Sequence, residues 1–284
     1  MIEPLLADDA FLADVARARD EGGGFRLWWL GQSGFLVQWD GRHLLLDPYL
    51  SESLTKKYAG TDKPHVRLTR RVVAPERLDF VDVVTSSHNH TDHLDGETLG
   101  PLRVANPSLK LVIPEANRAF VAERLRSDPA WPLGLDEGQE IEVAGFRVAA
   151  VPAAHEAIDR DAHGRCHYLG YVVRFGPWSL YHPGDCVPYD GQVERLRPFA
   201  IDLALLPING RSPERRVPGN FTGREAARLA HDIGARLAVP CHYDMFEFNT
   251  ASPYAFREEC ARLGQACRVL GGGERVASHD LEAR

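Results

Sequence analysis

The chain has no excess of positive charge and no long apolar run. Its 284 residues include 33 Lys and Arg against 40 Asp and Glu, so the formal net charge is −7. Proteins that bind duplex nucleic acid usually present a basic face, and this composition argues against that class. No stretch approaches the roughly 18 uninterrupted apolar residues of a membrane-spanning helix, so we expect no membrane segment.

Cysteine is also scarce. The five cysteines form an odd set without CxxC spacing, which favours reduced thiols over a disulfide framework. Residues 1–20 carry four aspartates among their apolar residues, a composition unlike that of a signal peptide. We therefore expect a cytoplasmic protein.

Hydrophobic residues make up 44% of the chain, and their spacing alternates between strand and helix periods. Helices are expected at 4–20, 115–126, after the capping box that begins at Thr222, and between Ser252 and Gly264. Strands are expected at 26–30, 35–39, 43–46, 80–86, 109–113, 140–143, 146–151, 168–175, 178–182, 203–206 and 237–240. No repeat or low-complexity linker divides them. We expect one α/β (α+β) domain, 1–284, with two helix-covered sheets and an N-terminal helical extension at 1–24.

A polar and irregular segment, residues 51–79, interrupts this pattern. It carries several lysines and arginines, and long loops in compact domains are often functional. Two roles are compatible with this composition, a loop that closes over a substrate and an ordinary solvated loop.

The most informative segment is 88–93, with the sequence HNHTDH. It follows a buried strand, and three imidazoles and one carboxylate within six residues suit zinc, iron or manganese. In an extended chain His88 and His90 point to the same side, whereas a turn at Thr91 would direct Asp92 and His93 to a second point. One loop could then serve two metal ions.

Three more candidate ligands follow other predicted strands. His155, Asp185 and His242 each lie just beyond a strand end. Strand ends are where α/β folds usually place active-site residues, so we expect these side chains to meet the first group at one rim.

This order of residues resembles the metallo-β-lactamase fold superfamily, whose pattern is HxHxDH, a distant His, an Asp after Gly, and a late His. The resemblance implies a four-layer αββα sandwich and two divalent metal ions. By position, His88, His90 and His155 would hold one ion, and Asp92, His93 and His242 the other. The carboxylate shared between them would come from Asp185. Asp47, in Leu-Asp-Pro, would hydrogen-bond a ligand histidine.

A finer resemblance is to the L-ascorbate-6-phosphate lactonase branch. It is carried by WLGQSGF at 29–35, LPINGR at 206–211, Gly-Asn at 219–220 and HYDMF at 242–246. It implies Mn²⁺, although Zn²⁺ also suits the ligands, and it implies a possible homo-oligomer. Asn209, Asn220 and Tyr243 become expected substrate-binding residues, and the Arg211 guanidinium could clamp a substrate phosphate.

The expected activity is hydrolysis of a small, phosphorylated substrate. Two divalent ions would lower the pKa of a water shared between them, and the resulting hydroxide could open a sugar lactone. Asp92 and Asp185 could accept or relay the proton. The same site could instead cleave a phosphodiester in a cyclic nucleotide, an RNA end or a phospholipid. An oxygen-reducing di-iron protein and a binding protein without activity are the alternatives from other classes.

Overall fold

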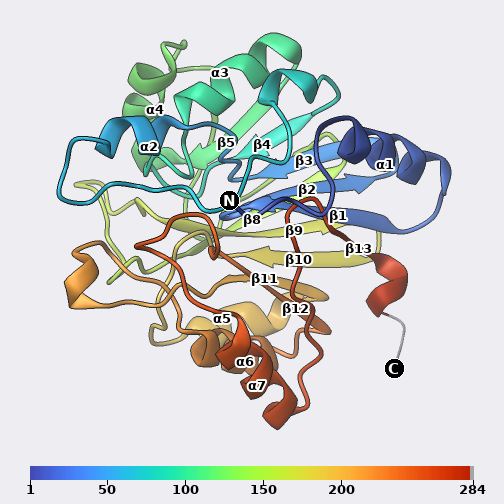
Figure 1. Cartoon of the computed structure of the whole chain (residues 1–284), viewed down its shortest axis with the longest axis vertical. Coiled ribbons are helices and arrows are strands. Elements are labelled where there is room, and N and C mark those ends of the chain that lie inside the picture. The colour runs from blue at the N-terminus through green and yellow to red at the C-terminus, as the bar shows by residue number, and fades with distance from the viewer. Residues whose placement is uncertain (282–284) are drawn as a thin grey trace.

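Two β-sheets pack face to face within residues 1–281, the part of the chain that the computed structural model describes (Figure 1). The first has the order β13-β1-β2-β3-β4-β5-β6, and its strands are Arg275–Ala277, Phe25–Gly31, Gly34–Trp39, Arg42–Leu46, Val83–Thr85, Lys110–Pro114 and Leu133–Leu135. The second has the order β12-β11-β10-β9-β8-β7, formed by Leu237–Cys241, Leu203–Pro207, Trp178–His182, Leu169–Phe175, Phe146–Pro152 and Glu140–Val143.

Helices cover the outer face of each sheet, which confirms the expected αββα sandwich (Figure 1). On the first sheet lie α1 (Asp8–Asp20), α3 (Gly96–Ala105) and α4 (Arg118–Leu125). On the second lie α5 (Gln192–Leu196), α6 (Gly223–Asp232) and α7 (Tyr254–Leu263). A short helix, α2 (Ser53–Tyr58), packs its Leu54 in a separate small cluster with Tyr49, Met245 and Phe246.

Strand β1 shows why the layers form. Leu27 and Trp29 point into the core between the sheets, whereas Trp28 and Leu30 point into the core under the outer helices. Successive side chains of a strand face opposite sides, so a strand buried on both faces must be apolar throughout. The Trp28 indole also donates a hydrogen bond of 2.9 Å to Asp14, which fixes α1 on the sheet.

Several element boundaries differ from the expectation. The first helix begins at Asp8, because the preceding backbone is hydrogen-bonded elsewhere: Ile2 N–H to Leu68 O and Leu5 N–H to Gly272 O, both at 2.7 Å. The helix expected at 115–126 begins with a 3₁₀ turn, Glu115–Asn117, before α4. The pattern also failed to predict β6, β13 and α5. Helix α2 lies within 51–79, a segment expected to be irregular. Residues 282–284 of the expected domain lie outside the described residues.

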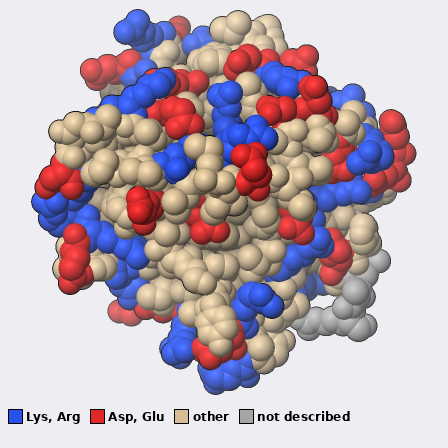
Figure 2. Space-filling model, viewed as in Figure 1, with Lys and Arg blue, Asp and Glu red and all other residues tan. Residues whose placement is uncertain are grey.

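The surface carries both signs of charge. Figure 2 shows Lys and Arg interspersed with Asp and Glu over one face. Many of these groups pair, as Lys56 does with Glu97 at 2.7 Å and Arg216 with Asp62 at 2.6 Å. None of the helices in the described part of the chain combines the length and apolar character needed to cross a bilayer.

Candidate metal centre

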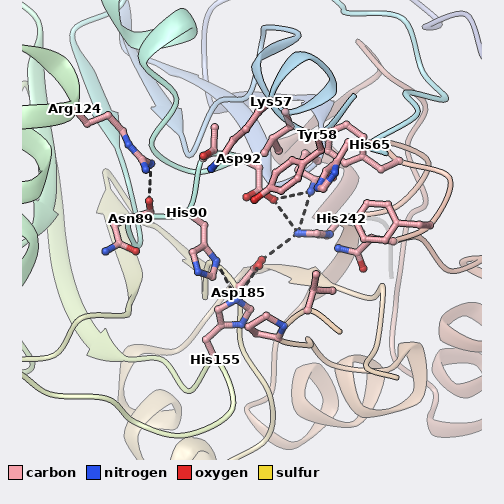
Figure 3. Close-up of a pocket in the computed structure, with 18 of the residues that line it drawn as sticks. Lys57, Tyr58, His65, Asn89, His90, Asp92, Arg124, His155, Asp185 and His242 are labelled. Carbon is pink, nitrogen blue, oxygen red and sulfur yellow. Dashed lines mark hydrogen bonds and ion pairs between the residues drawn. The ribbon is translucent and has the colours of Figure 1, made fainter. Parts of the chain in front are cut away.

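All seven predicted ligands lie together at one rim of the sandwich, and Figure 3 shows His90, Asp92, His155, Asp185 and His242 among them. Each occupies the loop after a strand, so their positions are set by the sheets beneath them. The loop after β4 carries four of them, and the loops after β8, β10 and β12 carry one each: His88, His90, Asp92, His93, His155, Asp185 and His242. We call this set the His/Asp cluster.

The cluster divides into two groups that share Asp185. His88, His90, His155 and Asp185 offer ligand atoms within 4.8 Å of one another, and so do Asp92, His93, Asp185 and His242. The two oxygens of Asp185 face different groups. Oδ1 lies 3.2 Å from His93 Nε2 and 3.3 Å from His242 Nε2, whereas Oδ2 lies 3.6 Å from His155 Nε2. The cluster therefore offers two groups of ligand atoms that share one carboxylate.

Hydrogen bonds outside the cluster orient three of its rings. Asp47 accepts from His93 Nδ1 at 2.8 Å, as expected for a residue that supports a ligand. His88 Nδ1 lies 3.0 Å from Ser87 Oγ, and His155 Nδ1 lies 3.2 Å from Gly219 O. With Nδ1 engaged in each ring, Nε2 is left to face the interior of the cluster, which is how metal-binding histidines are usually held.

The residues fit a bound metal cation. The Nε2 atoms of His88 and His93 and the Oδ1 atom of Asp185 are buried, yet none has a hydrogen-bond partner within residues 1–281. Buried polar atoms without partners are costly, and a cation would satisfy all three. The donor set is nitrogen and oxygen only, so Mn²⁺, Zn²⁺ and iron are each compatible with it.

The electrostatics also favour a cation. Burial lowers the pKa of His88, His90 and His155, which keeps these rings neutral and able to bind metal. Burial acts in the same direction on His242, but the carboxylates of Asp185 and Asp92 outweigh it and raise the pKa of that ring to about 9. The same carboxylate field that holds a proton on His242 would attract a divalent ion.

Three residues at this rim have strained backbone conformations. His242, Asp47 and Gln32 have φ angles of 61°, 37° and 49°, a region that non-glycine residues seldom occupy. Such conformations each cost of order 1 kcal/mol and persist where the surrounding structure imposes them, commonly at functional sites. Gln32 uses this conformation to reach the cluster. Its Nε2 donates to Asp92 Oδ2 at 2.8 Å and lies 3.0 Å from His242 Nε2.

A cavity of about 350 Å³ opens above the cluster. Sequence reasoning did not identify most of its walls, because they come from α2, α4 and loops that carry no motif. The side chains that line it beyond the cluster include Gln32, Lys57, Tyr58, His65, Asn89, Phe120, Arg124, Phe246, Phe248 and Asn249.

The four expected substrate-binding residues do not line this cavity. Asn209 and Asn220 are buried and bonded to each other at 2.9 Å, and Asn220 also accepts from the Cys186 backbone. The hydroxyl of Tyr243 donates to Leu270 O at 2.6 Å. Arg211 points to a neighbouring cavity and to Glu225, with which it makes two hydrogen bonds of 2.7 and 2.6 Å. The structure therefore places none of these four side chains in the wall of the cavity above the cluster.

The chain is similar to known proteins in both sequence and fold. Residues 42–243 match the family model described as a beta-lactamase superfamily domain. A protein from Opitutus terrae named UPF0173 metal-dependent hydrolase is 29% identical over 258 residues, which covers 88% of this chain and 99% of the relative.

Two solved structures share the fold. Igni18, a metallo hydrolase from Ignicoccus hospitalis, has a TM-score of 0.65 at 23% identity, over 90% of this chain and 98% of that one. An isothiocyanate hydrolase from Delia radicum gut bacteria has a TM-score of 0.70 at 19% identity, over 89% and 98% of the two chains. At these identities the likeness extends to the fold alone.

Proposed function

The chain belongs to the beta-lactamase superfamily, and we propose that it is a metal-dependent hydrolase that opens the ring of a phosphorylated sugar lactone such as L-ascorbate 6-phosphate. The observation that carries the proposal is the His/Asp cluster, with Asp185 between its two groups and a cavity above it. The relative from Opitutus terrae is named as a metal-dependent hydrolase, which supports the reaction class.

Two divalent ions held by the cluster would supply an activated water and a Lewis acid for the carbonyl. The chain's own residues would then transfer one proton. Asp92 borders the cavity, and its Oδ2 is held by Gln32. It is placed to take the proton that the attacking water gives up. When the ring C–O bond breaks, the same carboxyl can return that proton to the ring oxygen, so the step is balanced.

The size of the cavity supports a small substrate. About 350 Å³ is at the lower end of the range for small-molecule pockets and suits a six-carbon lactone with one phosphate. The lactone assignment itself depends on the resemblance of four stretches to the lactonase branch, of which the 29–35 stretch contains Gln32, a residue that contacts the cluster.

The test is to strip the protein of metal, reload it with Mn²⁺ or Zn²⁺, and measure hydrolysis of L-ascorbate 6-phosphate and of bis(p-nitrophenyl) phosphate. We expect metal-dependent opening of the lactone, and loss of that activity in Asp185→Ala. Turnover of the phosphodiester alone would assign the cluster to phosphodiester cleavage instead. No turnover of either compound by the loaded protein would contradict both functions.

A further inference from the structure

Two cationic side chains line the cavity without a carboxylate partner. Lys57 reaches it from α2 and Arg124 from α4. Neither makes an ion pair with any Asp or Glu among residues 1–281. The adjacent Lys56 differs, because its Nζ lies 2.7 Å from Glu97. In a chain with a net charge of −7, two cations that line one cavity without a carboxylate partner are a specific feature.

Arg124 also stabilises the loop that carries four of the ligands, and this explains its position. Its Nη1 donates to Asn89 O at 2.6 Å and to Leu94 O at 3.2 Å, so one nitrogen joins both ends of the loop that carries four ligands. The guanidinium is planar with five N–H donors, and these two bonds occupy only one nitrogen. The side chain is half-buried, packed over the Phe120 ring at 4.4 Å, and therefore held in place.

The side of the cavity opposite Arg124 carries a group of aromatic rings. His65 stacks on Tyr58 with ring centroids 4.2 Å apart, and it meets Phe248 at 4.5 Å and Phe246 at 5.1 Å. Figure 3 shows Arg124 on one side of the His/Asp cluster and Tyr58 and His65 on the other, with Lys57 above Asp92. The cavity thus has Arg124 on one side, an aromatic wall on the other with Lys57 Nζ 5.1 Å from the centre of the Tyr58 ring, and the cluster as its floor.

From this arrangement we propose that Lys57, supported by Arg124, binds the phosphate of the substrate and so makes the enzyme select a phosphorylated lactone over its unphosphorylated form. The inference rests on the proposed function and moves the phosphate contact from Arg211 to the cavity. The Glu225 carboxylate already neutralises Arg211, whereas the charge on Lys57 is available. The aromatic wall offers apolar area to the carbon skeleton, and a phosphate at the end of that skeleton would lie beside Lys57, whose Nζ is 5.1 Å from the centre of the Tyr58 ring.

A binding experiment separates this inference from the proposed reaction. Glucose 6-phosphate and glucose differ by the phosphate and contain no lactone, so they probe recognition without hydrolysis. We would measure their affinity for the zinc-loaded protein by calorimetry, in the wild type, in Lys57→Met and in the control Lys56→Met. Lys57→Met keeps the length of an exposed side chain, and thermal unfolding would verify that each variant is folded.

We expect Lys57→Met to weaken glucose 6-phosphate about tenfold or more, which is the usual cost of losing a charged hydrogen bond, with no change for glucose. Lys56→Met should behave as the wild type. With L-ascorbate 6-phosphate as substrate, the same loss should appear in KM and leave kcat nearly unchanged. Equal affinities in all three proteins would overturn the inference and show that the phosphate binds elsewhere, whether or not the lactone is hydrolysed.

Discussion

Asp47 shows how much of this site depends on one residue that touches no predicted ion. Its carboxylate is fully buried and accepts hydrogen bonds from Thr85 Oγ1 at 2.8 Å, from the Ser87 backbone at 3.1 Å and from His93. Burial alone would raise the pKa of Asp47, but the bond from His93 and its other donors hold that pKa below its ordinary value. The carboxylate therefore stays charged and fixes the ring of His93.

Asp47→Asn should lower metal affinity about 10- to 100-fold, the usual effect of losing a residue that orients a metal ligand. The amide cannot accept from Ser87, Thr85 and His93 as the carboxylate does. Competition with a chelator would measure the affinity, and Asp20→Asn, an exposed carboxylate at the end of α1, is the control. If Asp47→Asn binds metal as tightly as the control, the ring of His93 is held by packing alone.

The seven cluster residues were predictable from sequence, because their spacing and the strands before them are local signals. Lys57, Tyr58 and Arg124 were not, since no motif marks them and only the folded chain brings α2 and α4 to the same cavity. Arg211 was expected to bind substrate, but it lines a neighbouring cavity, for a related reason. A guanidinium after a strand end has many carboxylates within reach, and the sequence does not show that Glu225, held by its own capping box, is the one it meets.

At the scale of elements, the site is a set of loops that must approach one another closely. Gly184, just before Asp185, has a φ of 64°, and a Cβ at this position would lie 2.2 Å from Ser87 Oγ. Ser87 in turn contacts Asp47 and His88. The backbone of the loop after β10 therefore packs against a side chain of the loop after β4. No space for a methyl group remains between them.

Gly184→Ala should separate these two loops, reduce metal affinity and lower the free energy of unfolding by about 1–3 kcal/mol. Gly41→Ala is a matched control, because Gly41 has a similar φ of 70° with no atom within 4 Å of an added Cβ. Urea unfolding and metal competition measured on both variants would separate strain from steric overlap. Equal metal affinity in the two variants would mean that the loops can move apart without cost to the site.

Local signals at helix ends also explain which elements were predictable. The capping box of Thr222 and Glu225 begins α6 as the sequence indicates, and Gly264 ends α7. Strand β13 was missed because it is three residues long and gains its stability by pairing with β1, nearly the whole chain away. Its apolar content is too small to predict a strand, and the pairing is a property of the folded molecule.

At the scale of the whole molecule, the two sheets share one core and the first sheet has another beneath its helices. His43 lies at the edge of the second core, buried, 4.7 Å from the Phe80 ring and 3.0 Å from the Gln38 amide. Burial, assisted by the charge of Arg19, lowers the pKa of His43 to about 4.

This pKa makes stability depend on pH. The folded chain keeps His43 neutral, whereas the unfolded chain protonates it below its ordinary pKa of 6.5, so the stabilisation is present above pH 6.5 and is lost as the pH falls towards 4. Between pH 7.5 and pH 5 the loss should be about 2 kcal/mol. Urea unfolding of the wild type, of His43→Gln and of the exposed control His231→Gln would measure it. If His43→Gln loses as much stability as the wild type over this range, other groups are responsible.

The central proposal is that the His/Asp cluster would hold two ions with Asp185 between them, and counting bound metal tests it most directly. Wild type, His155→Ala, His242→Ala and the double variant would be dialysed against limiting free Zn²⁺ and analysed for metal per chain. The geometry predicts about two ions in the wild type, about one in each single variant and almost none in the double variant. A single ion in the wild type, or two ions retained in both single variants, would contradict the account.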